Sequence, residues 1–311
     1  MIKAEDLGRV VVLMGGKSTE KDVSRSSGSG VLAALKSRGV QAEAFDPGVE
    51  PLEKLAAGHY DRAFNMLHGL GGEDGTIQGV LEWLRIPYTG SGVLASALAI
   101  DKNATCKLWK SEGVPVPDGM LVDSSDQAGE VIARLGRSLV VKPDREGSSF
   151  GVVKLEDATE ETLADAIRTS GKLDHVLVEK RLHGREFTVA VLGEGASAHA
   201  LPVIEIIAPG GDYNCVNKYQ GNDVRYACPA DLPEELAARI QVDVVKGYRA
   251  VGARGWGRID VMLDADGSHA LLEINTNPGM TPHSLVPMAA RAVGLSYEDL
   301  VMKVAAEARL D

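Results

Sequence analysis

Two strand-like segments near the carboxyl end of the chain carry the side chains best suited to chemistry. Residues 257–263 and 269–275 are joined through residues 266–267, an Asp-Gly dipeptide typical of a two-residue type I′ hairpin turn. Because side chains alternate along a strand, this turn predicts one apolar face, made of Ile259, Val261, Leu263, Ala270, Leu272 and Ile274. The other face then carries four polar side chains, which are Arg258, Asp260, Glu273 and Asn275.

In this register Asp260 lies directly opposite Glu273, and Arg258 lies opposite Asn275. Two carboxylates about 5 Å apart repel each other unless a positive charge lies between them. Carboxylate and amide oxygens are ligands that Mg²⁺ prefers, so the set suits a magnesium site. A solvated charged face of a surface hairpin is the alternative interpretation. The clustering of all four residues beside 278–281, a turn that presents backbone N–H groups, favours the metal site.

A polar glycine loop could bind the phosphate group that usually accompanies a magnesium ion bound in this way. Residues 145–151 (REGSSFG) lie between two predicted strands, and Lys142 ends the first of them. Backbone N–H groups in loops of this kind can bind an anion. The Gly-Lys-Ser order of a P-loop is missing, and residues 15–18 (GGKS) lack the third glycine of a dinucleotide-binding fingerprint. Taken alone, the loop is more often a flexible turn.

The segments that position these residues alternate in the manner of an α/β protein. Strand-like residues 9–14 and 61–67 are each followed by a glycine-containing loop and a helical pattern, which predicts a mostly parallel N-terminal sheet. Further strands are predicted at 138–142, 152–155, 175–179, 186–192 and 198–207, with helices around Leu108 and after Pro233. Residues 209–229 form a long irregular stretch, which in a compact protein is usually functional.

The composition is that of a folded, acidic protein. The chain has 311 residues, with 44 acidic and 33 basic side chains and a net charge of −11. This balance argues against a protein that binds nucleic acid or an anionic membrane through its overall electrostatic field. The sequence predicts neither a transmembrane helix nor a signal peptide. Three widely spaced cysteines fit reduced thiols, so we expect a cytoplasmic protein.

Five motifs, in order along nearly the whole chain, resemble those of the D-alanine–D-alanine ligases. They are residues 15–24 (GGKSTEKDVS), 68–75 (HGLGGEDG), 142–149 (KPDREGSS), 256–260 (WGRID) and 273–287 (EINTNPGMTPHSLVP). The resemblance implies the three-part ATP-grasp fold, α/β in class and α+β overall. Its parts would be a parallel-sheet α/β domain (1–101), a central domain (102–184) and a C-terminal domain (185–311) with a lid loop (209–229). The sequence departs from the motifs at Lys17, Thr19, Ile274, Asn277 and residues 215–217.

The resemblance also implies a reaction. ATP would phosphorylate one D-alanine, and a second D-alanine would displace phosphate to give D-alanyl-D-alanine for peptidoglycan precursors, with two Mg²⁺ or Mn²⁺ ions. The family implies a homodimer. Two rivals stay open, a ligase that uses D-lactate as second substrate, for which Tyr219 is the discriminating residue, and a nucleotide-binding regulator that has lost catalysis. The intact metal-site residues argue against the regulator.

Residue roles follow from the same resemblance. The metal ligands would be Asp260, Glu273 and Asn275. ATP would be bound by Lys102, Lys142, Ser148, Ser149, Glu179, Lys180, Leu182, Glu186 and Lys218. The substrates would be bound by Glu20, His68, Ser284 and the N–H of Leu285, and the catalytic set would be Glu20, Ser148, Tyr219, Arg258 and Gly279. Other interpretations are a helix-dipole acid for Glu20, a surface histidine for His68 and a helix cap for Ser284.

Overall fold

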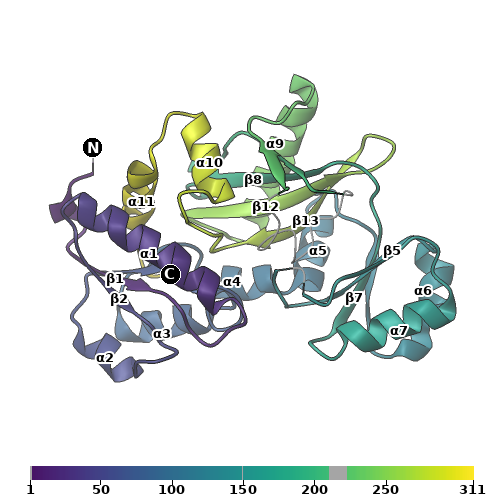
Figure 1. Ribbon diagram of the computed structural model, residues 1–311, viewed down its shortest axis with the longest axis horizontal. Coiled ribbons are helices and arrows are strands. Elements are labelled where there is room, and N and C mark those ends of the chain that lie inside the picture. Colours follow the sequence, from purple (N-terminus) through teal and green to yellow (C-terminus); the bar gives the residue numbers. More distant parts are fainter. Residues whose placement is uncertain (1, 149, 210–222) are drawn as a thin grey trace.

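The computed structural model describes residues 2–148, 150–209 and 223–311. Within these residues the chain forms three β-sheets, which lie at the left, top and right of Figure 1 and pack against helices. The N-terminal sheet is parallel, whereas the central and C-terminal sheets are antiparallel. The predicted α/β class and the predicted parallel N-terminal sheet are therefore confirmed.

The N-terminal part contains η1 (Ala4–Asp6), β1 (Arg9–Leu13), α1 (Lys21–Ser37), β2 (Gln41–Phe45), α2 (Leu52–Ala57), β3 (Arg62–Asn65), α3 (Thr76–Leu84) and α4 (Val93–Ile100). Strand β1 lies between β2 and β3, and residues 10–13 are completely buried. One face of β1 packs against α1, and the other packs against α2 and α3. Because β1 and β3 are parallel, the loops that carry Glu20 and His68 leave the sheet at the same edge.

The central part contains α5 (Lys102–Ser111), β4 (Gly119–Val122), η2 (Ser125–Gln127), α6 (Ala128–Leu135), β5 (Leu139–Pro143), β6 (Val153–Leu155), α7 (Glu160–Ser170) and β7 (Val176–Lys180). Its sheet has the order β4-β7-β5-β6, with a core formed against α6 and α7. The glycine loop, residues 145–151, joins β5 to β6 and is anchored at both ends. Arg145 forms a bidentate ion pair with Asp174, and the Ser170 hydroxyl donates to the Gly151 carbonyl at 2.6 Å.

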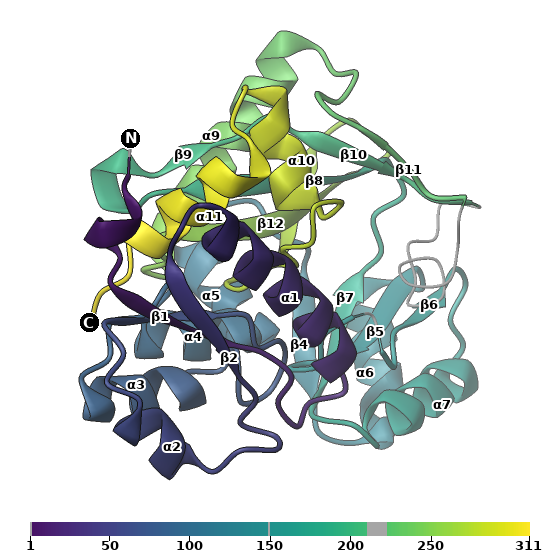
Figure 2. The ribbon, with the colours of Figure 1, turned by 60° about the vertical axis from the view of Figure 1, so that its left-hand side comes forward.

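The C-terminal part contains β8 (Glu186–Leu192), η3 (Gly195–Ser197), β9 (His199–Ala200), β10 (Ile204–Ile207), β11 (Arg225–Ala227), α9 (Glu234–Ala250), β12 (Trp256–Leu263), β13 (His269–Asn275), α10 (Leu285–Ala292) and α11 (Tyr297–Ala306). Its sheet has the order β11-β10-β8-β12-β13, and β9 also pairs with β8. One face packs against α9 and Trp109 of α5. The other face shares a core with α10, α11, α1 and β1, so the N-terminal and C-terminal parts of the chain pack together, as Figure 2 shows.

The turn of the β12–β13 hairpin differs from the prediction. The Asp264 N–H donates to the Ser268 carbonyl at 2.7 Å, so the loop has three residues, 265–267. Gly267 has φ +82°, the left-handed conformation that closes a three-residue hairpin loop. The predicted two-residue turn was therefore wrong, although the Asp-Gly dipeptide does lie in the loop.

A bulge restores the predicted register at the other end of the hairpin. The pairing shifts between Asp260 and Val261, where Leu272 is the extra residue on β13. Leu271, rather than the predicted Leu272, therefore pairs with Val261 and enters the core. Beyond the bulge the predicted pairs are confirmed, which are Asp260 with Glu273 and Arg258 with Asn275.

Two other strand predictions need correction. The strand predicted at 198–207 is divided into β9 and β10, because Pro202 lies between them and offers no N–H for the ladder. The irregular stretch predicted at 209–229 includes β11, which pairs with β10. Residues 210–222 of that stretch lie outside the described residues.

The proposed domain boundaries remain predictions, and the cores show how the parts are joined. Trp109 and Val114, from the predicted central domain, pack in the core of the C-terminal sheet. At the chain end, Arg309 forms a backbone bridge with Tyr88 of the N-terminal part. A search of the described helices finds none that is both long and apolar enough to cross a membrane.

Candidate active site

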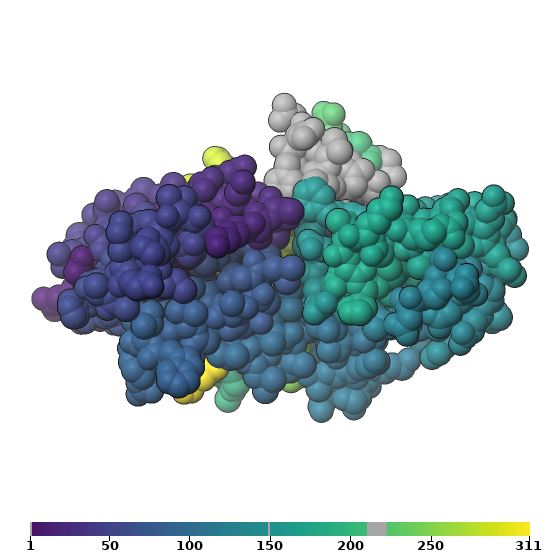
Figure 3. Space-filling model, turned by 90° about the horizontal axis from the view of Figure 1, so that it is seen from below, coloured from purple at the N-terminus to yellow at the C-terminus, as the bar shows by residue number. Residues whose placement is uncertain are grey.

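A cavity of about 630 Å³ lies where loops from the three parts meet. The N-terminal part in purple and blue and the central part in teal adjoin along a seam in the space-filling view (Figure 3). Nine residues predicted from the sequence line the cavity, namely Glu20, His68, Ser148, Arg258, Glu273, Asn275, Gly279, Ser284 and Leu285. The fold thus brings together residues that are far apart in the chain.

Glu20 precedes α1 and reaches the glycine loop. Its carboxylate accepts a hydrogen bond from the Ser148 hydroxyl and makes no helix-capping bond, although its N-cap position is also consistent with the helix-dipole interpretation. A Cβ placed on Gly69 or Gly147 would lie 2.8 or 2.7 Å from Oε2 of Glu20, so the carboxylate fits only between glycines. Burial and the nearby charge of Glu73 raise the pKa of Glu20, although the Ser148 bond opposes this shift. A bound cation would therefore stabilise the ionised carboxylate.

His68 is buried, not a surface residue, and faces a carboxylate. Its Nδ1 lies 3.7 Å from Oε1 of Glu73, whose Oε2 accepts the Gly69 N–H at 2.8 Å. Burial disfavours the imidazolium, but the hydrogen bond and charge of Glu73, with the charge of Glu20, outweigh it and raise the pKa of His68. Among the described residues its Nε2 has no hydrogen-bond partner. The ring can therefore offer one N–H to an anion in the cavity.

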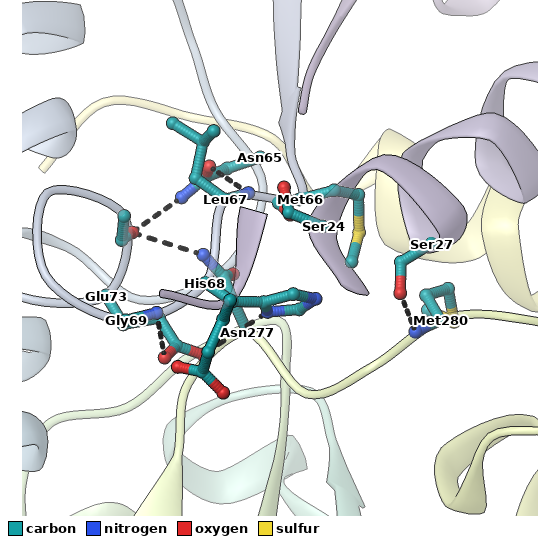
Figure 4. A network of polar contacts seen from close by, with 12 residues as sticks. Ser24, Ser27, Asn65, Met66, Leu67, His68, Gly69, Glu73, Asn277 and Met280 are labelled. Carbon is teal, nitrogen blue, oxygen red and sulfur yellow. Dashed lines mark hydrogen bonds and ion pairs between the residues drawn. The ribbon is translucent and has the colours of Figure 1, made fainter. Parts of the chain in front are cut away.

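A single carbonyl ties the His68 loop to the C-terminal part. The Gly72 oxygen accepts hydrogen bonds from Asn65 at 3.0 Å, Gln78 at 2.9 Å and Asn277 at 3.4 Å. Figure 4 shows Asn65 and Asn277 close to His68 in this network. Asn277, one of the departures from the family motif, thus bridges two parts of the molecule.

The polar face of the hairpin is neutralised by cations. Arg258 donates through Nε and Nη2 to the two oxygens of Asp260, each at 2.8 Å. The Thr188 hydroxyl donates to Oδ1 of Asp260 at 2.6 Å. Lys102 lies 3.6 Å from Oε2 of Glu273. These contacts offset the repulsion expected between the two opposed carboxylates.

The donor set fits a hard divalent cation. Residues 2–148, 150–209 and 223–311 contain no group of three or more His, Cys, Asp and Glu side chains arranged to hold a metal. The predicted set instead combines two carboxylates, Asp260 and Glu273, with the amide of Asn275, and all three lie at one end of the hairpin. These are oxygen ligands of the kind that Mg²⁺ accepts, and part of a bound ion's shell would be left for phosphate or water.

Two buried lysines lie next to this face. Nζ of Lys142 lies 2.6 Å from Oε2 of Glu179, and Lys102 donates to the Glu146 carbonyl at 2.8 Å. Burial would lower the pKa of Lys142, but the neighbouring negative charges, Glu179 first, outweigh it and raise the pKa. Cys106 lies 3.8 Å from Glu179, and burial raises the pKa of its thiol to about 12. Lys142 therefore stays a cation, and Cys106 stays a neutral thiol.

The remaining predicted nucleotide residues lie away from the cavity. Lys180 is exposed and donates to Asp118 at 3.3 Å, and Leu182 lines a separate hollow. Glu186 begins β8 and pairs with Met262. Three predicted residues, Ser149, Lys218 and Tyr219, lie outside the described residues.

The turn after β13 presents polar groups to the cavity. The Ser284 oxygen accepts the Thr281 N–H at 3.0 Å and lies 2.8 Å from the Thr281 hydroxyl. Ser284 holds the N-cap position of α10, but its side chain does not cap the helix. If the Thr281 hydroxyl donates, the Ser284 proton is left for a ligand. Beside it, the N–H of Leu285 begins α10, where backbone N–H groups favour an anion.

Sequence reasoning missed several residues that support the site. Glu73 lies in the 68–75 motif and contacts His68, but the motif alone does not indicate this role. Thr188 contacts Asp260, and its signal was a polar residue in the otherwise apolar stretch of β8 that follows Glu186. Ser27 contacts the turn after β13 across more than 250 residues, and no local pattern could have indicated this contact.

Comparisons with known proteins agree with the motifs. Residues 43–91 match the family model described as "D-ala D-ala ligase N-terminus", and residues 108–306 match the one described as "D-ala D-ala ligase C-terminus". A D-alanine–D-alanine ligase from Ralstonia nicotianae is 53% identical over 309 residues, which cover 99% of this chain and 93% of that protein. The enzyme of that name from Bordetella petrii is 51% identical over 98% of this chain and 93% of its own length.

Solved structures extend the similarity to the fold. The D-alanine–D-alanine ligase from Bacillus anthracis has a TM-score of 0.81 and 34% identity, with 96% of each chain covered. Its complex with ATP has a TM-score of 0.80 and 32% identity over the same coverage. The VanG D-Ala:D-Ser ligase from Enterococcus faecalis has a TM-score of 0.81 and 30% identity, covering 96% of this chain and 98% of that one. The chain therefore belongs to the D-alanine–D-alanine ligase family.

Proposed function

We propose that this chain joins two D-alanine molecules into D-alanyl-D-alanine, with a D-alanyl phosphate formed from ATP as the intermediate, to supply peptidoglycan precursors. The observation that carries the proposal is the single cavity in which Glu20, His68, the hairpin's polar face and the 279–285 turn meet. The names of the relatives support D-alanine as substrate, and the ATP complex of a structural neighbour supports ATP.

Glu20 and His68 would bind the first D-alanine. The ammonium group would pair with Glu20, whose buried carboxylate needs a nearby positive charge. The substrate carboxylate would accept a hydrogen bond from Nε2 of His68, which otherwise lacks a partner among the described residues. Both contacts would orient the first D-alanine, with its ammonium group at Glu20 beside the glycine loop and its carboxylate at His68.

ATP would be bound between the central and C-terminal sheets by the predicted set, which is Lys102, Lys142, Ser148, Ser149, Glu179, Lys180, Leu182, Glu186 and Lys218. Asp260, Glu273 and Asn275 would hold two Mg²⁺ or Mn²⁺ ions, which neutralise phosphate charge when bound. Lys142 supports this role because it is a buried cation beside the same face. A carboxylate oxygen of the first D-alanine attacks the γ-phosphorus, its bond to the β-γ bridging oxygen breaks, and ADP leaves.

Arg258 and the N–H of Gly279 would stabilise the oxyanion of the second step. Ser284 and the Leu285 N–H would hold the carboxylate of the second D-alanine. Its neutral amine attacks the acyl carbon, the bond to phosphate breaks, phosphate leaves with the electron pair, and the amine releases a proton to solvent. Fixed donors aimed at the developing charge account for a large part of such catalysis.

The lid remains a proposal that concerns residues 209–229. Tyr219 would hydrogen-bond toward Glu20 and Ser148 when the site closes, excluding water that would hydrolyse the intermediate. Tyr226, at the described end of this stretch, lines the cavity. Its position supports a loop that covers the site.

Product formation tests the function. ADP and dipeptide should form with Mg²⁺-ATP and D-alanine, and neither should form with L-alanine or without an amino acid. Adding D-lactate or D-serine beside D-alanine identifies a depsipeptide ligase or a D-Ala:D-Ser ligase. Equal ADP release without any amino acid would identify an ATPase and reject the proposal.

We also propose a homodimer that works in the cytoplasm, where ATP is available. The family to which the chain belongs supports the dimer, and Trp83 of α3, which is 90% exposed, is one side chain that such an interface would cover. Sedimentation should give twice the chain mass of 32.9 kDa. A mass of one chain at micromolar concentration would reject the dimer.

A further inference from the structure

The turn that follows β13 is held at consecutive backbone groups. The Met280 N–H donates to the Ser27 hydroxyl oxygen at 3.1 Å, and the Met280 carbonyl accepts the Tyr297 hydroxyl at 2.6 Å. The next N–H, of Thr281, donates to Ser284 at 3.0 Å. Ser27 belongs to α1 and Tyr297 to α11, so two helices that lie far apart in the sequence hold one residue through its N–H and its carbonyl. Figure 4 shows the Ser27–Met280 contact near His68.

These contacts are dry and closely fitted. Ser27 and Met280 are completely buried, so losing either hydrogen bond would leave a backbone group without a partner or water. A Cβ on Gly30 would lie 2.7 Å from the Tyr297 hydroxyl and 3.6 Å from the Met280 carbonyl. Gly30 therefore provides the space that lets Tyr297 reach across α1 to the turn.

Gly279 differs from the residues that follow it. No described residue accepts a hydrogen bond from its N–H, and Gly279 lines the cavity. A Cβ there would lie 3.2 Å from the Ser284 oxygen. The peptide plane that follows Gly279 is held by Ser27. The next peptide plane is held by Tyr297 and Ser284. With those planes fixed, the direction of the Gly279 N–H is restricted.

We propose that Ser27 and Tyr297 are positioning residues that aim the Gly279 N–H at the oxyanion formed when the second amine attacks the D-alanyl phosphate. This inference rests on the proposed function. An oxyanion donor works at about 2.7–3.1 Å from the developing charge, and a displacement of about 1 Å can cost about 100-fold in rate. Side chains that never touch substrate can therefore control the second step.

The consequence is loss of coupling between the two steps. Phosphoryl transfer to the first D-alanine does not use the Gly279 N–H, so it should continue in a variant with a loosened turn. The slower amine attack leaves the intermediate exposed to water, whose oxygen bonds to phosphorus while the bond from phosphorus to the acyl oxygen breaks, a route that forms no oxyanion at the acyl carbon. D-Alanine is then returned in place of the dipeptide, while phosphate is released by either route.

The test uses Tyr297→Phe and Ser27→Ala in the full-length enzyme, with dipeptide and phosphate measured together. We expect the dipeptide-to-phosphate ratio to fall at least 3-fold in each variant, while the KM for ATP changes less than 2-fold. Tyr60→Phe removes a comparable hydroxyl contact, to Glu43, and Ser37→Ala removes one, to Ala34, at the other end of α1. Both controls should keep the wild-type ratio even where they melt earlier.

The outcomes separate this inference from the proposed function. A wild-type enzyme that makes no dipeptide would reject the function itself. A wild-type enzyme that couples ATP use to dipeptide, with Tyr297→Phe equally coupled and only less stable, would overturn the positioning role. Tyr297→Phe keeps the whole ring, so it tests the inference even if Ser27→Ala fails to fold.

Discussion

At the scale of single residues, the hairpin's polar face holds its carboxylates in different ways. Asp260 accepts hydrogen bonds from Arg258 and Thr188, whereas the nearest ion pair of Glu273 among the described residues is with Lys102 at 3.6 Å. Glu273 lines the cavity and is 29% exposed at its side chain. Glu273 can therefore exchange its protein contact for a bound ion with a smaller structural change than Asp260.

Glu273→Gln should separate activity from stability. The change removes a negative charge from the metal face, and metal stabilisation of a transition state amounts to several kcal/mol, so turnover should fall by at least about 100-fold. It also relieves repulsion with Asp260 while losing a partly exposed ion pair, so unfolding free energy should change by less than about 1 kcal/mol. Turnover across a Mg²⁺ titration and thermal melting measure the two effects.

Glu205→Gln is the matched control for that substitution. Glu205 also pairs with a cation on the C-terminal sheet, accepting two hydrogen bonds from Arg185 at 2.6 Å, but it does not line the cavity. It should keep nearly full turnover. Near-normal turnover of Glu273→Gln at saturating Mg²⁺ would show that Glu273 is not a metal ligand.

The site could be predicted from the sequence only where residues share a local pattern. Side-chain alternation places Asp260 and Glu273 on one face, but their pairing is predicted correctly only because the three-residue turn and the bulge at Leu272 offset each other. Ser27 and Tyr297 gave no such signal, since their contact to Met280 depends on how α1 and α11 pack on the C-terminal part. Contacts of this kind require the tertiary structure.

At the scale of elements, hydrophobic patterns located the buried strands and missed partly exposed ones such as β2 and β4. Strand β1 has four buried residues in a row, whereas β2 buries only Phe45 and has a weak pattern. The hairpin shows the other limit. An Asp-Gly pair suits both two-residue and three-residue loops, so sequence could not decide the turn, and the bulge at Leu272 corrected the register independently.

The start of α5 combines two acidic side chains at one helix terminus. Asp101 accepts the Ala104 N–H at 2.7 Å, and the buried Asp144 accepts the Asn103 N–H at 2.9 Å. Burial raises the pKa of Asp144 to about 6, with help from the charge of Asp101, although the Asn103 bond opposes the shift. Ionising both Asp101 and Asp144 at this helix terminus therefore costs free energy.

Asp144→Asn should make the protein more stable above pH 6. Between the ordinary carboxyl pKa near 3.8 and the folded value near 6, the folded state binds the proton more tightly, so wild-type stability falls as pH rises through this window. The amide keeps the acceptor for Asn103 and cannot ionise. Chemical unfolding at pH 8 should show the variant about 1–3 kcal/mol more stable, with a smaller difference at pH 4.

Asp174→Asn should change stability at pH 8 in the opposite direction. Although burial opposes ionisation, the hydrogen bonds from Arg145 outweigh it and lower the pKa of Asp174. Its stabilising contribution is present above the unfolded pKa and is lost as pH falls, so this variant should be less stable than wild type at pH 8. A stability difference for Asp144→Asn that does not vary with pH would contradict its raised pKa.

At the scale of the whole molecule, the catalytic cavity depends on contacts between parts that lie far apart in sequence. The core under the C-terminal sheet includes β1 and α1 of the N-terminal part. Across the cavity, the hydrogen bond from Ser148 to Glu20 joins the central glycine loop to the N-terminal part. The shared core joins the N-terminal and C-terminal parts through apolar packing. The Ser148 bond joins the N-terminal and central parts through a polar contact.

Replacing Ser148 should weaken this link in a way that two variants can resolve. Ser148 has φ +55°, a conformation that is strained for any residue with a Cβ. Ser148→Ala keeps the strain and removes the hydroxyl, whereas Ser148→Gly removes both. Both variants should lose a similar fraction of ligase activity. The glycine variant should nevertheless be about 1 kcal/mol more stable than the alanine variant.

The pH profile identifies the partner that these variants disturb. The Ser148 hydrogen bond favours ionised Glu20 and so lowers its pKa. Without that bond the pKa of Glu20 rises, and because the first D-alanine needs ionised Glu20, the acidic limb of kcat/KM for D-alanine should move to higher pH in both variants. Ser138→Ala, which removes a hydroxyl contact to His183 elsewhere in the central part, should leave the limb in place. If neither Ser148 variant moves the limb, then Glu20 does not pair with the substrate ammonium, and the link between the parts serves stability alone.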